Sequence, residues 1–230
     1  MIDTEKIIAD TVAAFKSSLH RFKNLPTVDE DEYKHLHKLP LTPLSIKIDC
    51  DLFLKEISTF SNYFYQWGTQ HTELPRYGLA LVNQDGILRS NDPVNGSLYE
   101  WNINHPNRSL IETDFLTPTA VMTMQSLKPL AAFNKYWCRS NILRWGKSAM
   151  FAPHIDTIIP SPWLRLWAAT SKDIVVNFYV DGKIITPTIE PGRLYLIDTS
   201  LVHDAVSHND VYQLFLSVKP EAINILKTLV

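Results

Sequence analysis

A histidine and a carboxylate stand two residues apart in the apolar stretch FAPHIDTIIP, residues 151–160. Successive side chains of a β-strand point to opposite faces, so His154 and Asp156 are expected to share one face while Ile155 points the other way. Imidazole and carboxylate groups are both good ligands for divalent metal ions. The pair therefore predicts part of a metal site, whose third ligand must come from elsewhere in the chain.

The chain has eight histidines, and His203 is the best partner for this pair. On a strand over 202–207, His203 shares its face with Ala205 and Ser207, and such a small, polar-tolerant face suits a site. His208 borders a turn and is expected to be exposed, so we favour His203. His154, Asp156 and His203 then form a set of two histidines and one carboxylate. This set leaves metal positions open for a co-substrate and O₂, as in non-haem Fe(II) oxygenases.

The composition restricts the class of protein. With 230 residues, 45% of them hydrophobic and 20% charged, the chain suits one domain, 1–230, with a substantial core. A formal net charge of −2 gives no basic excess for nucleic acid or an anionic membrane, and two cysteines are too few for a disulfide scaffold. No signal peptide or membrane-spanning run is recognisable. We therefore expect a cytoplasmic protein that binds neither nucleic acid nor membranes.

Residues 137–218 have the pattern of an all-β core. Short apolar runs alternate with turn sequences, and Asp181-Gly182 between two of them is a strong hairpin sequence. Closely spaced short strands predict a mainly β fold of the jelly-roll type with flanking helices. Eight strands are predicted, over 140–146, 151–158, 163–169, 173–180, 183–188, 193–197, 202–207 and 211–218.

Residues 1–136 are expected to form a helical and loop-rich elaboration packed outside this core. Ile8, Val12, Phe15 and Leu19 follow helical spacing and predict a helix over about 4–20. Strands are expected within 44–51 and 77–86, with Asp51 at the end of the first as the cap of a following helix. The remaining expectations are an extended connector over 24–43, a long loop over 91–109 that is a candidate lid, and a helix in the second half of 117–137.

Several motifs in residues 137–218 resemble one family as a set. RSNILRW, FAPHID, WLRLWAA and PGRLYLIDTSLVHDAVSH resemble the aspartyl/asparaginyl β-hydroxylase-like branch of the Fe(II)- and 2-oxoglutarate-dependent oxygenases. Pro153-His154 matches the first ligand motif, and Pro191-Gly192 with Asp198 leads to His203 as the last ligand. The resemblance covers about residues 137–218. It implies a double-stranded β-helix, or cupin, core.

The same resemblance implies an activity. It predicts a dioxygenase in which Fe(II), 2-oxoglutarate and O₂ together hydroxylate an unactivated C–H bond. The implied substrate is an amino-acid side chain, either in a protein or in a free small molecule. Fe(II) would be the cofactor, held by His154, Asp156 and His203, and 2-oxoglutarate the co-substrate.

Two positions depart from the family pattern. Many members of the branch have Asn or Gly two residues after the first histidine, whereas Asp156 restores the full ligand set. Many 2-oxoglutarate enzymes also have a basic residue about ten positions after the last histidine, where this chain has Gln213. Glutamine can donate a hydrogen bond to a carboxylate but cannot form a charge-assisted pair with it.

A cation elsewhere is therefore needed for the far carboxylate of 2-oxoglutarate. Arg165 lies in an apolar strand and requires an anion, which is either this carboxylate or a structural Glu or Asp. We predict 2-oxoglutarate contacts for Arg165, Arg144 and Gln213, with Arg139 as a further substitute. Trp145, Trp163 and Trp167 either line a substrate opening or pack in the core.

Two other classes of protein remain open. One is a non-catalytic cupin-like module that binds a metal or another ligand, which the glutamine at position 213 favours. The other is a cupin metalloenzyme that does not use 2-oxoglutarate. The complete ligand set of His154, Asp156 and His203 favours the oxygenase over both.

Overall fold

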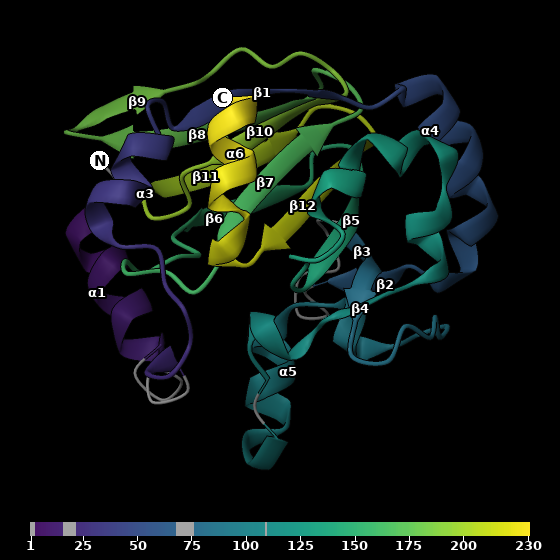
Figure 1. Ribbon diagram of the computed structural model, residues 1–230, viewed down its shortest axis with the longest axis horizontal. Helices are drawn as coiled ribbons and strands as arrows, with labels where there is room; N and C mark the ends of the chain where they lie inside the picture. Colours follow the sequence, from purple (N-terminus) through teal and green to yellow (C-terminus); the bar gives the residue numbers. More distant parts are fainter. Residues whose placement is uncertain (1–2, 16–21, 68–75, 109) are drawn as a thin grey trace.

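The computed structural model describes residues 3–15, 22–67, 76–108 and 110–230. Two antiparallel sheets face each other in it (Figure 1). The small sheet has the strand order β6–β11–β8–β9 and the large sheet the order β1–β10–β7–β12–β5–β3–β2, with β4 paired to β3. Their shared core is a double-stranded β-helix.

All eight predicted strands of the core are present. They are β5 (Ser140–Trp145), β6 (Met150–His154), β7 (Leu164–Ala169), β8 (Ile174–Val180), β9 (Lys183–Ile185), β10 (Arg193–Ile197), β11 (Val202–Ser207) and β12 (Val211–Val218). Strand β6 ends at His154, earlier than predicted, so Asp156 follows the strand instead of lying on it.

Turn chemistry sets the register of these strands. Asp181 and Gly182 both have positive φ, 49° and 73°, as a tight hairpin turn between β8 and β9 requires. Gly192, before β10, has φ 78°, and a Cβ there would lie 2.4 Å from the Ile48 carbonyl oxygen. The glycine of the Pro-Gly motif is therefore needed for both its backbone conformation and its lack of a side chain.

Residues 1–136 do more than cover the core, because four of their segments extend the large sheet. These strands are β1 (Leu41–Lys47), β2 (Tyr65–Trp67), β3 (Arg76–Asn83) and β4 (Thr117–Pro118). Strand β1 pairs with β10 at one edge, and β3 pairs with β5 at the other. The predicted boundary at residue 137 is thus not a boundary of the sheet.

The helices depart from the sequence expectations in several places. The α-helices are α1 (Thr4–Phe15), α3 (Glu30–Leu36), α4 (Cys50–Ile57), α5 (Leu98–Asn104) and α6 (Ile223–Leu229), and the 3₁₀ helices are η1 (Ser58–Tyr63), η2 (Pro93–Asn95), η3 (Pro106–Arg108), η4 (Glu112–Asp114), η5 (Ala120–Thr123), η6 (Gln125–Phe133) and η7 (Pro220–Ala222).

Three of these elements correct the expectations. The predicted connector over 24–43 contains α3, and the predicted long loop over 91–109 contains α5, so neither segment is free of helix, and the role of 91–109 as a lid stays a prediction. The cap of α4 is Asp49, whose carboxylate accepts from the Leu52 N–H at 3.0 Å, and not Asp51. The part of the predicted first helix beyond residue 15 lies outside the described residues.

The two faces of the large sheet bury different cores. Its outer face packs against helices α3, α4, η6 and α6 in one cluster that includes Phe53, Leu166 and Leu216. Its inner face packs against the small sheet in a second cluster that includes Trp167 and Phe178. Strand β8 illustrates the alternation, since every second residue from its start, Ile174, Val176 and Phe178, points inward.

Helix α1 contacts β6 and β11 on the outer face of the small sheet, and α6 contacts β1 of the large sheet. In Figure 1 the C-terminal helix α6 crosses in front of the large sheet. Among the described residues, no helix is long and apolar enough to cross a bilayer.

Candidate metal centre

The three predicted ligands lie together at one end of the small sheet. His154 ends β6, His203 lies on β11, and the two residues are direct partners across the ladder. The imidazole Nε2 atom of His154 lies 3.6 Å from Asp156 Oδ1, and that of His203 lies 3.8 Å from Asp156 Oδ2. One potential ligand atom from each residue lies within 4.8 Å of the other two. This arrangement is compact enough to surround a single ion.

Backbone hydrogen bonds fix the orientation of both imidazoles. His154 Nδ1 donates to the Ala152 carbonyl at 2.7 Å, and His203 Nδ1 donates to the Leu201 carbonyl at 2.9 Å. With the proton on Nδ1, the Nε2 atom of each ring faces Asp156. Carbonyls that hold the second nitrogen of an imidazole in this way are typical of metal-binding histidines.

The electrostatics of the triad also suit metal binding. Burial lowers the pKa of His203 to about 4, assisted by its neighbour His154, so this ring is neutral at pH 7. Burial alone would raise the pKa of the Asp156 carboxyl, but His154, His203 and Arg165 outweigh it and hold that pKa well below its usual value. A neutral imidazole and an ionised carboxylate can bind a cation without first losing protons.

A turn between β10 and β11 holds the segment that carries Asp156. The Asp156 N–H donates to the Thr199 carbonyl at 2.9 Å, and the hydroxyls of Thr157 and Thr199 are 2.7 Å apart. The same turn is anchored by Asp198, which accepts from the Tyr33 hydroxyl at 3.1 Å. Since Tyr33 belongs to α3, the N-terminal part of the chain helps to position a metal ligand.

Arg165 has a structural anion in the protein, which is one of the two alternatives left open by the sequence. Its Nη2 donates to Glu112 Oε1 at 3.0 Å, and its Nη1 donates to the Ser217 hydroxyl. Arg139 Nη1 lies 3.8 Å from the same Glu112 oxygen, and Arg139 Nη2 donates to the Gly96 carbonyl. Both arginines are about 95% buried. The geometry therefore favours a structural role for Arg165 over direct contact with a co-substrate.

Sequence reasoning missed Glu112, which lies in the N-terminal part of the chain. It belongs to the short helix η4, and its backbone carbonyl also accepts from the Arg139 N–H at 3.1 Å. The residue carries no motif of its own. A buried arginine requires a nearby anion, which predicts that Arg165 has a carboxylate partner. The sequence does not identify which Asp or Glu provides it.

Arg144 does not reach the interior, which corrects its predicted contact with 2-oxoglutarate. It lies between Leu143 and Trp145 on β5, and those two side chains pack between the sheets. Arg144 therefore faces outward, with its guanidinium over the rings of Tyr77 and Phe64, 4.4 and 5.5 Å from the ring centroids. The strict alternation of the strand excludes it from the barrel.

Gln213 does face the interior and is 5% exposed. It pairs with Leu143 of β5 and Ala169 of β7, both of the inner core. Its Oε1 atom is buried and has no hydrogen-bond partner in the described part of the chain. The Gln213 side chain therefore faces the interior, and its contact with a co-substrate stays a prediction.

Aromatic side chains surround the triad. Phe151 lies against His154, with ring centroids 3.9 Å apart, and Phe178 lies 5.9 Å from His203. The Arg76 guanidinium, which sequence reasoning missed, lies 4.0 Å from the Phe151 ring centroid. Trp145, Trp163 and Trp167 are all buried, which agrees with the core-packing alternative.

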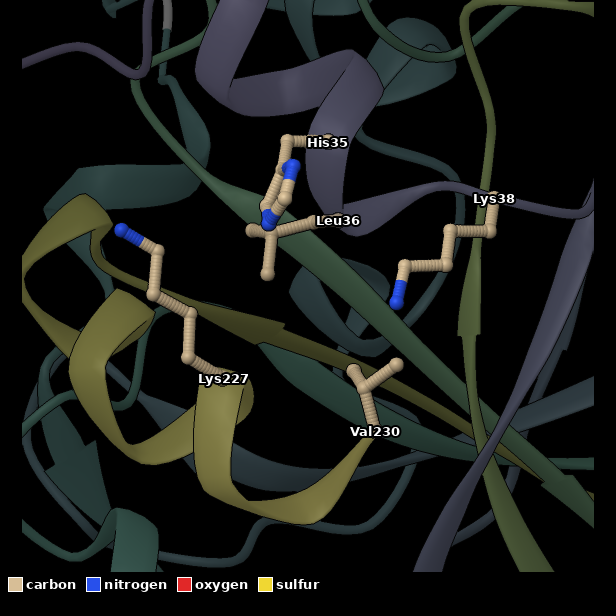
Figure 2. A pocket seen from close by; sticks show the side chains of 5 residues that line it. All are labelled: His35, Leu36, Lys38, Lys227 and Val230. Atoms are coloured by element: carbon tan, nitrogen blue, oxygen red, sulfur yellow. The ribbon is translucent and has the colours of Figure 1, made fainter.

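A separate pocket lies between α3 and the end of α6 (Figure 2). It is lined by His35, Leu36, Lys38, Lys227 and Val230, and Figure 2 shows side chains from the two helices facing each other across it. The ammonium group of Lys227 bonds to Glu32 at 2.7 Å. None of these residues belongs to the metal-ligand set.

Comparison with known proteins gives no family assignment. No family model and no curated protein matches the chain. A solved oxidoreductase of the 2OG-Fe(II) oxygenase family from Burkholderia pseudomallei is 11% identical, with 72% of this chain and 77% of that chain covered and a TM-score of 0.41.

Two further solved structures match smaller parts. KdgF from Halomonas sp. is 15% identical over 35% of this chain and 67% of that chain, with a TM-score of 0.28. An oxalate oxidase in complex with glycolate is 13% identical over 35% of this chain, with a TM-score of 0.29, and the match spans only 41% of that protein. Similarity at this level concerns the fold, so the chemistry has to be argued from the side chains of this site.

Proposed function

We propose that this protein is an Fe(II)- and 2-oxoglutarate-dependent oxygenase that hydroxylates an unactivated C–H bond of an amino-acid side chain. The observation that carries the proposal is the orientation of the triad, in which both Nε2 atoms face the Asp156 carboxylate. Two imidazoles and one carboxylate are a donor set that suits Fe(II) and leaves other metal positions open. The resemblance of residues 137–218 to the aspartyl/asparaginyl β-hydroxylase-like branch favours the same activity.

The donor set fits a divalent ion by its own chemistry. His154, Asp156 and His203 would hold the iron, which together with 2-oxoglutarate supplies the oxidising chemistry. Asp156 contributes one negative charge, and its segment is held by the Thr199 carbonyl. Buried Arg165 acts on Asp156 at longer range and helps to keep it ionised.

The interior surface limits what else can react near the metal. Phe151 and Phe178 cover the two imidazoles with apolar rings. Apolar walls reduce the access of water to the metal face and strengthen electrostatic interactions within the site. The chain thus provides ligand orientation, charge and apolar neighbours for the metal ligands, while the substrate itself is expected to be a side chain of a protein or a small molecule.

An anaerobic absorption experiment tests the proposal. Purified protein with Fe(II) and 2-oxoglutarate should develop a weak visible charge-transfer band, and admission of O₂ with an oxidisable substrate should release succinate. The band requires both the metal and the 2-oxo acid on it. His203→Ala, which removes one metal ligand, should show no band under the same conditions.

The other outcomes identify the alternative classes of protein. Iron binding without any band on addition of 2-oxoglutarate would indicate a cupin metalloenzyme that does not use this co-substrate, or a non-catalytic module that binds the metal. Absence of metal binding would indicate a non-catalytic cupin-like module. Either result would contradict the proposed function.

A further inference from the structure

Positive charge lies at two separate places along the interior of the large sheet. At one end, Arg165 and Arg139 both contact Glu112. Both arginines also interact electrostatically with Asp156, so two carboxylates balance their two charges beside the metal ligands. Each arginine keeps a buried Nε without a hydrogen-bond partner among the described residues, but the group of four charges has no excess for a bound dianion.

Arg76, the first residue of β3, lies at the other end of this interior. It pairs with Trp145 of β5, which packs between the two sheets. Directly opposed residues of an antiparallel pair share one face, so Arg76 also faces the interior. Trp145 pairs in turn with Val211 of β12. Ser217, which binds Arg165, lies six residues further along β12, or about 20 Å away, so the two positions are distinct.

The Arg76 end of the sheet is also where the family pattern has a basic residue. That position is occupied by Gln213, which pairs with Leu143 of β5. Leu143 pairs on its other side with Gly78, two residues after Arg76 on β3. Arg76 is thus separated from the position that lacks a cation by one strand and one step along the face.

Aromatic rings hold the Arg76 guanidinium toward the small sheet. Its carbon lies 4.0 Å from the ring centroid of Phe151 and 5.2 and 5.8 Å from those of Trp145 and Trp67. The Phe151 ring is itself 3.9 Å from the imidazole of His154. Rings engage the faces of a guanidinium, whereas its N–H groups donate in its plane. Arg76 therefore places a cation one aromatic ring away from a metal ligand.

We propose that Arg76 binds the far carboxylate of 2-oxoglutarate and supplies the cation that position 213 lacks. This inference rests on the proposed function. The metal neutralises one carboxylate of the dianion, so the far carboxylate needs a separate cation, and a guanidinium donates two parallel hydrogen bonds to it. Strand β3 lies outside residues 137–218, which explains why the motifs of that segment do not contain this arginine.

A matched pair of inert ligands tests the inference. N-Oxalylglycine is an analogue of 2-oxoglutarate, and N-ethyloxamate is the same molecule with its terminal carboxylate replaced by a methyl group. Calorimetric titration into Zn(II)-loaded protein should show the wild type binding N-oxalylglycine about ten- to hundred-fold more tightly than N-ethyloxamate. Arg76→Gln should remove this preference by weakening the binding of N-oxalylglycine alone.

Two further variants separate the charge of Arg76 from a structural role. Arg144→Gln is the matched control, because Arg144 also lies over aromatic rings but on the outer face of the same sheet, and it should leave both affinities unchanged. Adding Gln213→Arg to Arg76→Gln should restore about ten-fold in N-oxalylglycine affinity, because it returns a cation to the neighbouring position. Absence of this rescue would assign Arg76 a structural role and overturn the inference.

The failures are distinguishable. If neither ligand binds wild-type zinc-loaded protein, both the proposed function and this inference are overturned. If N-oxalylglycine binds, but Arg76→Gln leaves its affinity unchanged or weakens both ligands equally, the proposed function stands and the inference is overturned. The buried Nε atoms of Arg139 and Arg165 would then be the donors to test. Should Arg76→Gln not fold, Arg76→Lys replaces it, because lysine keeps the charge and loses the planar fork. It should still weaken N-oxalylglycine binding selectively, and an unchanged affinity would overturn the inference.

Discussion

The two sheets face the same interior but leave their polar side chains in different states. On the small sheet, the Nδ1 atoms of His154 and His203 bond to backbone carbonyls, and the adjoining Thr157 and Thr199 hydroxyls bond to each other. On the large sheet, Asn141 and Gln213 retain buried polar atoms without protein partners. The polar groups of the small sheet are therefore oriented by the protein itself, whereas these amide groups of the large sheet are not.

The comparison separates two kinds of preorganisation. A metal site requires ligands already oriented before the ion arrives, and hydrogen bonds to the backbone provide this on the small sheet. A site for a small organic molecule requires free donors and acceptors, which cost stability until they are used. The unpaired amide atoms of the large sheet therefore cost folding stability, whereas the hydrogen-bonded groups of the small sheet do not.

The largest expected effect follows from removing one of the two histidine ligands of the small sheet. His154→Ala or His203→Ala should abolish measurable iron binding, because two remaining ligands hold the ion weakly. His208→Ala is the matched control and should bind iron normally, since His208 is exposed beyond the end of β11. Equilibrium dialysis with metal analysis measures both. Loss of iron in His208→Ala with retention in His203→Ala would show that the wrong histidine was assigned.

The metal-ligand set of the small sheet is also the feature that sequence patterns predict best. The His154–Asp156 spacing and the position of His203 on a strand depend on local periodicity, which a single sequence displays directly. The eight core strands were predicted for the same reason. Asp156 lies beyond the end of β6, so the predicted geometry was slightly wrong although the three residues do lie together.

The large sheet was harder to predict because its site depends on contacts between distant segments. Glu112 meets Arg165 across 53 residues of sequence, and neither residue indicates the other. Asn141 lies within the RSNILRW motif, but its position beside Gln213 follows only from the pairing of β5 with β12. Arg144 was misassigned because the sequence pattern did not establish which face of β5 points inward.

The next largest effect is expected for Glu112→Gln, a variant that tests whether the buried charges of the large sheet are structural. Glu112→Gln removes the carboxylate shared by Arg165 and Arg139 and leaves two buried guanidinium groups without their nearest anion. We expect a loss of about 3–5 kcal/mol in the free energy of unfolding, measured by urea denaturation. Adding Arg165→Met to this variant should recover part of the loss, because it removes one uncompensated charge.

A surface ion pair provides the control for this variant. Arg89 Nη2 lies 2.6 Å from Asp85 Oδ2, and both side chains are close to half exposed. Exposed ion pairs contribute little to stability, so Asp85→Asn should leave the urea midpoint of unfolding nearly unchanged. If Glu112→Gln behaves like Asp85→Asn, the buried cluster is not structural. The assignment of Arg165 to a co-substrate carboxylate would then regain support.

The smallest effect concerns the helix that supports the metal side from outside the sheets. Tyr33→Phe removes the hydroxyl that donates to Asp198 and leaves the buried ring in place. The loss of one hydrogen bond to a charged acceptor should cost about 1.5–3 kcal/mol of stability. Because Asp198 also accepts from the Ser200 N–H, it anchors the turn whose Thr199 carbonyl holds the Asp156 N–H. Looser positioning of Asp156 should therefore weaken metal binding as well, by less than the roughly ten- to hundred-fold typical of direct partners of metal ligands.

Tyr179→Phe separates this coupling from a general loss of stability. Tyr179 also donates its hydroxyl to a carboxylate, Asp204, but this hydrogen bond joins two strands of the small sheet and does not involve the 198–200 turn. This control should lose stability without a change in metal affinity, as measured by competition with a chelating dye. Equal metal affinities in the two variants would mean that α3 stabilises the fold without positioning Asp156. A loss of metal affinity in Tyr33→Phe alone would instead show that Tyr33 helps to position the metal ligands of the small sheet, although it lies 121 positions before His154 in the sequence.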